Sequence, residues 1–251
     1  MKAWVPLGAA PIPGSPDQLE LWQRENEFSI RISGYVSELM NSRQHASEEA
    51  LAEYAVPQVA GRAAAHVLVG GLGMGFTLAA ALRSAGPDAT VTVAELVGAV
   101  VDWNRGPLGQ AAGYPLTDPR TRVHVGDVAD LIRASKRTFD AILLDVDNGP
   151  EGMTQHGNDW LYSPRGLAAI RAALTPGGLL AVWSVEAVPR FTAALERAGY
   201  HTEVRRARAR EGKGAWHTIW VARSDGEVVA GREGAYRLPF HPPVRKRAVS
   251  R

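Results

Sequence analysis

Residues 66–82 read HVLVGGLGMGFTLAAAL, and this stretch decides the fold. An apolar run leads into a glycine-rich turn that is followed by an Ala- and Leu-rich run, a pattern that predicts a strand, a tight turn and a helix. Gly71, Gly73 and Gly75 form a G-x-G-x-G turn, whose lack of Cβ atoms lets the backbone turn tightly and approach a nucleoside. The same glycines could instead serve only to let the strand and the helix pack closely, with no ligand bound. Phe76 stands at the last position of the dinucleotide fingerprint, which disfavours NAD, and no P-loop lysine follows.

The alternation of strand and helix continues along the chain and predicts an α/β fold with a doubly wound parallel sheet. Five apolar runs are expected to be strands buried on both faces: His66–Gly70, Thr90–Glu95, Arg122–Val125, Ala141–Asp145 and Leu179–Ser184. A closing antiparallel pair is expected at Thr202–Arg206 and His217–Ala222. Helices are expected at Ser163–Leu174, stopped by the Pro-Gly-Gly that follows, and at Pro189–Ala198, stopped by Gly199.

The first sixty residues read differently. Glu27–Ile32 and Tyr35–Leu39 predict a small β-hairpin that turns at Ser33-Gly34, and Ser47–Val59 predicts a helix. We therefore expect an N-terminal appendage over residues 1–60, a nucleoside-binding catalytic domain over 61–224 and an extended basic tail over 225–251. The hairpin is a candidate homodimer contact.

Acidic residues follow two successive strands after the glycine turn. Glu95 ends the second strand, where its carboxylate can accept hydrogen bonds from both ribose hydroxyls. Asp127 follows the third strand and can accept from an adenine amine, although it would serve equally well as a helix N-cap. Because the carboxyl ends of parallel strands meet at one edge of the sheet, these groups and the glycines are expected to share one crevice.

Composition narrows the class of protein. The 251 residues include 45% hydrophobic and 22% charged residues and no cysteine, so disulfides, thiolate zinc sites and a cysteine nucleophile are excluded, and we expect no metal. The start of the chain is apolar but broken by prolines, unlike a signal peptide or membrane span, so a cytoplasmic protein is expected. A basic run from Arg205 to Lys213 predicts a solvated hairpin rather than an RNA-binding surface, since aromatic residues do not alternate with the arginines.

Taken in order, the motifs resemble the spermidine synthase family, within the class I S-adenosylmethionine-dependent methyltransferase fold with its seven-stranded sheet. The resemblance rests on the glycine turn, on LMNSRQ at residues 39–44, and on the acidic strand ends. It also rests on LLDVDNGPEG from Leu143, LYS at 161–163 and LTPGGLLAVW from Leu174. It implies a nucleoside cofactor, S-adenosylmethionine or its decarboxylated form, whose amino group faces Gln44. It also implies a small-molecule acceptor.

Two departures from the family pattern bear on the reaction. Gly73 stands where the family places an aspartate that holds the amino end of the decarboxylated cofactor, and Asn148 stands where the catalytic loop has its second aspartate. Arg43 could meet a carboxylate, which only the undecarboxylated cofactor carries. These features favour methyl transfer to a small nucleophile over aminopropyl transfer to a polyamine. A non-catalytic nucleoside- or RNA-binding protein remains a third hypothesis.

The catalytic and acceptor-binding residues are expected around the end of the fourth strand. Asp145 should contact the cofactor beside its donor carbon and should orient or deprotonate the acceptor, with help from Asp147 and Asn148. Tyr162 and His156 follow on the next loop and Trp183 ends the fifth strand, so these three are candidate acceptor contacts. Asp145 and Trp183 could instead have purely structural roles, and His156 could be a surface loop histidine.

Overall fold

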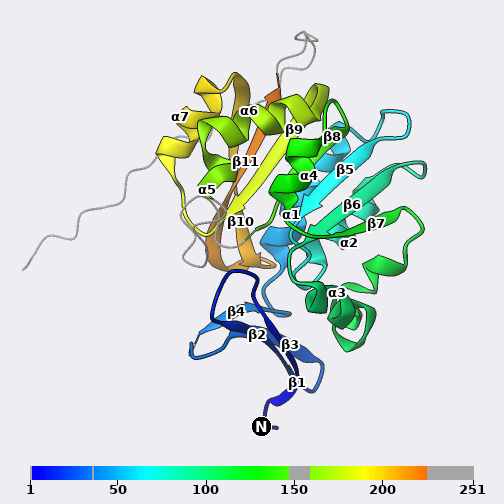
Figure 1. The fold of residues 1–251 in the computed structure, drawn as a ribbon, viewed down its shortest axis with the longest axis vertical. Coiled ribbons are helices and arrows are strands. Elements are labelled where there is room, and N and C mark those ends of the chain that lie inside the picture. Colours follow the sequence, from blue (N-terminus) through cyan, green and yellow to red (C-terminus); the bar gives the residue numbers. More distant parts are fainter. Residues whose placement is uncertain (1, 36, 147–158, 225–251) are drawn as a thin grey trace, which may run out of the picture.

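The computed structural model describes residues 2–35, 37–146 and 159–224, which form two β-sheets and the helices that cover the larger one (Figure 1). The smaller sheet consists of β1 (Val5–Pro11), β2 (Gln18–Arg24), β3 (Glu27–Ile32) and β4 (Glu38–Asn41). The larger sheet consists of β5 (His66–Gly70), β6 (Thr90–Glu95), β7 (Thr121–Val125), β8 (Phe139–Leu144), β9 (Leu174–Ser184), β10 (Tyr200–Arg210) and β11 (Lys213–Ser224). The α-helices are α1 (Ala46–Ala55), α2 (Phe76–Ser84), α3 (Gly98–Arg105), α4 (Val128–Ala134), α5 (Asp159–Tyr162), α6 (Pro164–Ala173) and α7 (Pro189–Arg197). Three short 3-10 turns are η1 (Val56–Gln58), η2 (Pro107–Ala112) and η3 (Pro115–Thr117).

The larger sheet confirms the α/β fold predicted from the sequence. Its strand order is β10-β11-β9-β8-β5-β6-β7, and every pair is parallel except those that β11 makes with β9 and β10. Strands β5 and β6 have the expected bounds. Strand β8 ends at Leu144, one residue before the expected end, so Asp145 lies just beyond the strand.

The start of the strand expected at Leu179 was predicted wrongly. Strand β9 begins at Leu174, so the Pro-Gly-Gly run at residues 176–178 lies inside the strand instead of between α6 and the strand. A register shift against β8 between Phe139 and Ala141 accommodates these residues, because an irregular pairing tolerates the missing N–H of proline.

The N-terminal sheet is larger than the predicted hairpin. Strand β3 has the expected bounds, but β4 begins at Glu38, three residues later than expected. Two further strands, β1 and β2, precede the hairpin, and all four pair in order as an antiparallel sheet. The prolines of β1 made this segment look like a loop in the sequence. They lie in an edge strand, where a missing N–H costs no ladder hydrogen bond.

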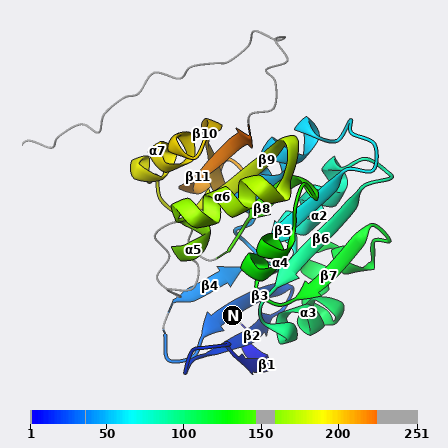
Figure 2. The same cartoon turned by 45° about the horizontal axis from the view of Figure 1, so that its top comes forward.

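The residues of the parallel strands alternate between two hydrophobic cores. Val67 and Val69 of β5 pack in the core under α1, α2 and α3, whereas Leu68 packs in the core under α4, α6 and α7. Both faces of the sheet are therefore covered (Figure 2), which explains the uninterrupted apolar runs in the sequence. Phe28 and Ile30 of the N-terminal sheet belong to the first core, so the two sheets share packing.

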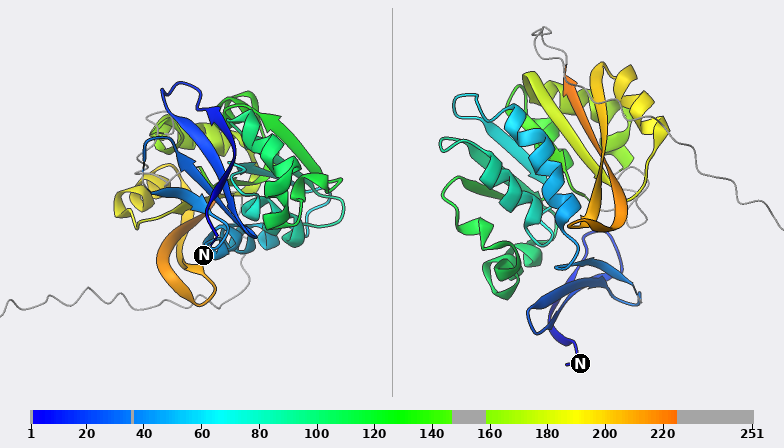
Figure 3. Two further views of the ribbon diagram at one scale, coloured as in Figure 1. Left: turned by 90° about the horizontal axis from the view of Figure 1, so that it is seen from below. Right: turned by 180° about the vertical axis from the view of Figure 1, so that it is seen from behind.

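The N-terminal sheet lies against the end of the molecule where the parallel strands finish (Figure 3). Helix α1 follows it and packs against α2 and against β9 and β10. Among the described residues, no helix is both long and apolar enough to cross a membrane.

Candidate active site

A cavity of about 590 Å³ lies between the N-terminal sheet and the carboxyl ends of the parallel strands. From the parallel sheet it is lined by Gly71, Gly73, Glu95, Asp127 and Asp145. These are five of the residues proposed from the sequence, and they come from four consecutive strand ends, as expected for a doubly wound sheet. The opposite wall belongs to the N-terminal sheet and is largely apolar, with Ile12, Leu19, Ile30, Ile32, Leu39 and Met40.

Gly71 is required by the close approach of two strand ends. Its φ is +88°, and a Cβ at this position would lie 2.3 Å from the carbonyl oxygen of Asp145. The Gly71 N–H donates to the carbonyl of Ala94 at 2.8 Å, and the Asp145 N–H donates to that of Gly70 at 2.9 Å. The turn thus holds the ends of β5, β6 and β8 in register.

Gly73 forms the part of the turn that faces the N-terminal sheet. Its φ is +49°, and a Cβ there would lie 3.1 Å from the sulfur of Met40 in β4. The carbonyl of Gly73 accepts from the buried side chain of Asn104 in α3, at 2.9 Å. Met40 therefore lies beside the position where the family pattern places an aspartate.

Gly75 shapes the turn from outside the cavity. It adopts φ +87° as the residue before α2, and its Cβ position lies 3.1 Å from Asn104 Oδ1. Gly75 does not belong to the cavity lining.

Glu95 is buried at the end of β6 and both of its carboxylate oxygens accept backbone hydrogen bonds. Oε2 accepts from Leu72 at 2.9 Å and Oε1 from Val97 at 2.8 Å, while its carbonyl accepts from Gly126 at 2.8 Å. The side chain thus ties the glycine turn to the loop after β6. A nucleoside ribose would share this carboxylate with the backbone donors.

Asp127 combines the two roles considered from the sequence. Its Oδ1 accepts from the Ala129 N–H at 2.8 Å and so caps α4, and the residue also lines the cavity. The cap leaves the second oxygen available for an exocyclic amine of a purine.

Asp145 lies beside two residues that the sequence analysis missed. Thr77 in the first turn of α2 donates its hydroxyl to Asp145 Oδ2 at 2.5 Å. The same Thr77 oxygen lies 3.2 Å from the carbonyl of Glu48 in α1. Burial raises the pKa of Glu48 well above its usual value, and the negative charge of Asp145 raises it further. Glu48 lies in the segment SEEAL, where no family motif is recognisable, so only the packing of α1 identifies it.

The remaining predicted site residues lie outside the cavity lining or outside the described residues. Gln44 precedes α1 and is partly buried, but it does not line the cavity. Tyr162 packs edge-on against Phe191 of α7, with ring centroids 5.5 Å apart. Trp183 packs edge-on against His217 at 4.8 Å, and His217 Nδ1 lies 2.7 Å from the hydroxyl of Ser47 in α1. Three predicted residues lie outside the described residues: Asp147, Asn148 and His156.

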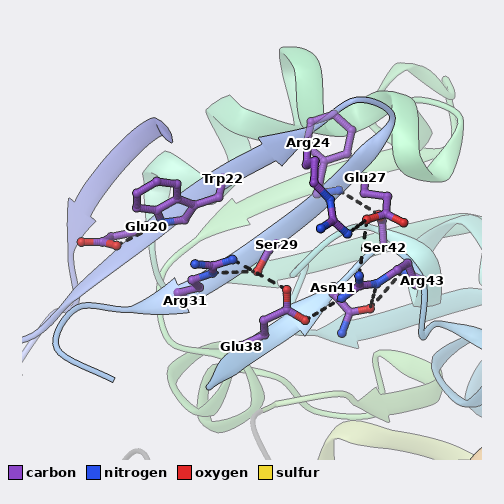
Figure 4. A network of polar contacts seen from close by, with 11 residues as sticks. Glu20, Trp22, Arg24, Glu27, Ser29, Arg31, Glu38, Asn41, Ser42 and Arg43 are labelled. Carbon is purple, nitrogen blue, oxygen red and sulfur yellow. Dashed lines mark hydrogen bonds and ion pairs between the residues drawn. The ribbon is translucent and has the colours of Figure 1, made fainter. Parts of the chain in front are cut away.

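The expectation for Arg43 was wrong. Its guanidinium lies 2.9 Å from Glu38 Oε2 and 3.4 Å from Glu27 Oε2, in the polar network of the N-terminal sheet shown in Figure 4. Arg43 also binds Asn41 Oδ1 through its backbone N–H at 3.1 Å. These partners already satisfy its charge, so Arg43 is not available to hold a cofactor carboxylate.

The charge of the cavity is negative. Its lining includes five acidic residues, and none of the described residues that line it is Lys, Arg or His. Glu38 is neutralised by Arg43, and its Oε1 lies 3.9 Å from the guanidinium of Arg31. The contacts described above for the other carboxylates are of a different kind. Asp127 and Glu95 accept from backbone N–H groups, and Asp145 accepts from a hydroxyl. The cavity is thus suited to a ligand with positive charge.

A larger open groove of about 1110 Å³ lies at the other end of the parallel strands, between α6 and α7. It includes Thr175 and Pro176 at the start of β9 and lacks the glycine turn and the acidic strand ends. Ligands of doubly wound folds bind at the carboxyl ends of the strands, so we assign the site to the smaller cavity.

Comparison with known proteins supports this assignment. The model of the spermine/spermidine synthase domain family matches residues 45–192, which is more than half of the chain. The chain belongs to this family. The match includes α1, the glycine turn and all strand ends of the cavity. Membership in the family makes the chain a transferase that acts on a small molecule.

Solved structures show the same fold at low sequence identity. A spermidine synthase in complex with the transition-state analogue AdoDATO superposes with a TM-score of 0.66 at 17% identity, covering 89% of this chain and 74% of that one. The spermidine synthase of Thermotoga maritima gives a TM-score of 0.66 at 16% identity with the same coverage. The O-methyltransferase TomG of Streptomyces achromogenes, in complex with SAM, gives 0.50 at 17% identity, covering 71% of this chain and 79% of that one. No curated protein sequence matches the chain.

The family match confirms the resemblance found in the sequence and bears on the reaction. The sequence analysis favoured methyl transfer and kept aminopropyl transfer as an alternative. The family supports the alternative better, and the contacts of Arg43 remove one of the three features that favoured methyl transfer.

Proposed function

We propose that this protein transfers the aminopropyl group of decarboxylated S-adenosylmethionine to a primary amine of a small acceptor. The observation that carries the proposal is the charge of the cavity, whose lining has five carboxylates and, among the described residues, no cation. The decarboxylated nucleoside carries a sulfonium and an ammonium group, both of which such a cavity stabilises. S-adenosylmethionine adds a carboxylate, which these groups would repel.

In this proposal the strand ends bind the nucleoside. Glu95 accepts from the ribose hydroxyls, Asp127 accepts from the adenine amine, and Gly71 and Gly73 allow the backbone to approach. Gln44, Gly75, Tyr162 and Trp183 stay predictions as cofactor or acceptor contacts, as do Asp147, Asn148 and His156.

Asp145 acts on the acceptor. The nucleoside supplies a carbon that is activated by the positive sulfur to which it is bonded. The acceptor ammonium loses a proton to Asp145, and its nitrogen then bonds to this carbon while the carbon–sulfur bond breaks and leaves its electron pair on sulfur. The hydrogen bond from Thr77 holds the Asp145 carboxylate in place during this step.

The experiment that tests the proposal is to supply each nucleoside separately, with a series of linear aliphatic diamines, and to identify the nucleoside product by mass spectrometry. We expect methylthioadenosine from the decarboxylated nucleoside, together with a diamine that has gained an aminopropyl group. Formation of S-adenosylhomocysteine from S-adenosylmethionine instead would establish methyl transfer. Failure of both nucleosides to bind would refute the site.

Methyl transfer is the second candidate, and one observation favours it. The turn position at which the family pattern has an aspartate is Gly73, and Met40 packs against it. The ammonium group of the decarboxylated nucleoside would therefore need another acidic partner. Asp17 and Glu38 also line the cavity, and Asp17 is the better candidate because Glu38 is already paired with Arg43.

A further inference from the structure

The hairpin of β10 and β11 projects from the larger sheet (Figure 3) and presents positive charge on one of its faces. Residues 203–213 include four arginines and one lysine but only two carboxylates. Side chains alternate between the two faces of a strand. Ala207 is buried in the core that α1 covers, so its neighbours Arg206 and Arg208 point to the opposite face of the hairpin.

An exposed tryptophan lies between these two arginines in space. Trp216 of β11 pairs directly with Arg208 across the hairpin and therefore shares its face. The guanidinium of Arg208 lies 4.0 Å from the centroid of the Trp216 ring, and that of Arg206 lies 5.2 Å from it. Trp216 nevertheless remains 44% exposed. The neighbouring strand thus supplies the aromatic residue that is missing between the arginines along the chain.

The charges of Arg206 and Arg208 are not compensated. Within the described part of the chain, no carboxylate forms an ion pair with either residue, whereas Arg205 is paired with Glu203 at 2.9 Å. Arg208 Nη1 donates to the carbonyl of Gly214 at 2.8 Å, which leaves its positive charge in place. A guanidinium stacked on a ring keeps donors at its rim, and these match the oxygens of a phosphate group.

We propose that this face of the hairpin binds single-stranded nucleic acid, with phosphates at Arg206 and Arg208 and a base stacked on Trp216. Unpaired bases stack on exposed aromatic side chains whatever their sequence, whereas the bases of a duplex are already stacked on one another. The inference does not depend on the proposed aminopropyl transfer. The acidic cavity and this basic face suit ligands of opposite charge, so the two sites are distinct.

A second basic surface of the molecule lacks the aromatic residue. Among the described residues, those that line the groove between α6 and α7 include four cations and no Phe, Tyr or Trp; the cations are Lys136, Arg137, Arg171 and Arg197. Lys136 and Arg197 are exposed, and no described carboxylate pairs with them. These two residues therefore provide a control that removes the same amount of charge from a surface without a stacking ring.

The first test measures how binding depends on salt. The full chain is titrated into a fluorescently labelled oligouridylate of about 16 nucleotides, and anisotropy gives the affinity between about 50 and 200 mM salt. Removal of two phosphate contacts in Arg206→Gln/Arg208→Gln should reduce the slope of log affinity against log salt by about 1.4. Lys136→Gln/Arg197→Gln should keep the wild-type slope. An equal reduction in both double variants would overturn the inference, because it would show attraction by charge alone.

The second test concerns the stacking ring. At fixed salt, Trp216→Ala should weaken binding by about tenfold, and Trp216→Phe, which keeps an aromatic ring, should stay within about threefold of the wild type. A duplex of the same length should bind more weakly than the single strand. Unchanged affinity in Trp216→Ala, or a duplex bound as tightly as the single strand, would overturn the inference. Thermal unfolding shows whether each variant is folded, and the arginine pair decides the question if Trp216→Ala is not.

The basic residues near the C-terminus offer another source of attraction for a polyanion. Arg245, Lys246 and Arg247 form a cationic run of their own in the sequence. If this run accounted for the binding, the hairpin variants would bind as tightly as the wild type, and the inference would be wrong. Absence of binding at about 50 mM salt, where phosphate contacts are strongest, would also overturn it.

Discussion

The two sheets that enclose the cavity hold their charged residues in different ways. At the edge of the parallel sheet, the carboxylates of Glu95 and Asp127 accept from backbone N–H groups, which orient them without neutralising them. In the N-terminal sheet, Glu38 at the start of β4 and Arg43 just after this strand form an ion pair that neutralises both charges (Figure 4). Hydrogen bonds from neutral N–H groups orient a carboxylate and leave its charge in place, whereas an ion pair compensates that charge. The following predictions test this difference, starting with the largest effect.

Asp145→Asn should have the largest effect, because it removes the proposed proton acceptor at the edge of the parallel sheet. We expect the rate of aminopropyl transfer to fall by about 10²–10⁴-fold, and the nucleoside affinity to fall by a much smaller factor because four other carboxylates line the cavity. The rate is measured by product formation and the affinity by calorimetric titration.

Asp130→Asn is the control for this variant, since Asp130 lies on the exposed side of α4 and pairs with Arg133. Its rate should equal that of the wild type. An Asp145→Asn variant that retains the full rate would show that Asp145 only closes the loop after β8.

Glu95→Gln should weaken nucleoside binding by about 30-fold. The amide keeps one acceptor but loses the charge, and hydrogen bonds to a charged group contribute about 1.5–3 kcal/mol. Calorimetric titration with the decarboxylated nucleoside measures this loss. Because Glu95 also binds Leu72 and Val97, thermal unfolding must be recorded to separate binding from stability. Unchanged affinity would contradict the assignment of Glu95 to the ribose.

Asp140→Asn should lower stability without affecting transfer, since Asp140 lies at the amino end of β8, away from the cavity. Its carboxylate accepts from Arg62 at 2.7 Å, Thr175 at 2.8 Å and the His66 N–H at 2.9 Å. Burial alone would raise the pKa of Asp140, but these three partners lower it below its ordinary value. We expect the free energy of unfolding to fall by about 1.5 kcal/mol near pH 7, as measured with denaturant.

The pH dependence of this loss follows from the direction of the pKa shift. A carboxylate with a lowered pKa in the folded protein stabilises it above the pKa of the unfolded chain, and this contribution is lost as the pH falls through the folded value. The difference between wild type and Asp140→Asn should therefore be full above about pH 4 and shrink at lower pH. A difference that grew on acidification would contradict the assigned ion pair.

Arg43→Met should have the smallest effect, because exposed and partly exposed ion pairs contribute about 0–1 kcal/mol. We expect the free energy of unfolding to fall by no more than about 1 kcal/mol, and the relative affinity for the two nucleosides to stay the same. Arg24→Met is a matched control, since Arg24 also binds Glu27, at 2.6 Å. A selective loss of S-adenosylmethionine binding in Arg43→Met alone would restore the interpretation of Arg43 as a carboxylate ligand.

The predictable parts of the site depend on local pattern. The glycine turn and Glu95 follow from residues that are adjacent to strand runs, because the ends of parallel strands must meet at one edge. Strands β1 and β2 could not be predicted in the same way, since the prolines in β1 are typical of a loop unless the strand is at an edge. The contacts of Thr77 with the Asp145 carboxylate and with the Glu48 carbonyl depend on how α1 and α2 pack against β8, over distances in the chain that no local pattern contains.

The basic run of the last hairpin also shows which features local pattern predicts and which depend on tertiary packing. The sequence predicted a hairpin, and β10 and β11 form it, but the run has no aromatic residue between its arginines. The tertiary structure pairs Arg208 with Trp216 of the next strand, so the guanidinium lies 4.0 Å from the ring centroid, and Arg206 lies 5.2 Å from the same ring. Cross-strand register, and not spacing along the chain, placed the aromatic residue beside the arginines.

The sequence by itself determined the α/β sheet, its glycine turn and the acidic residues at its strand ends, because these depend on hydrophobic periodicity and backbone conformation within short segments. Only the tertiary structure decided which charges remain available to a ligand. It paired Arg43 with Glu38, placed Met40 against Gly73 and brought the Thr77 hydroxyl to the Asp145 carboxylate. The physical reason is that the state of a charged group depends on its burial and on its neighbours in space, which packing between distant segments supplies.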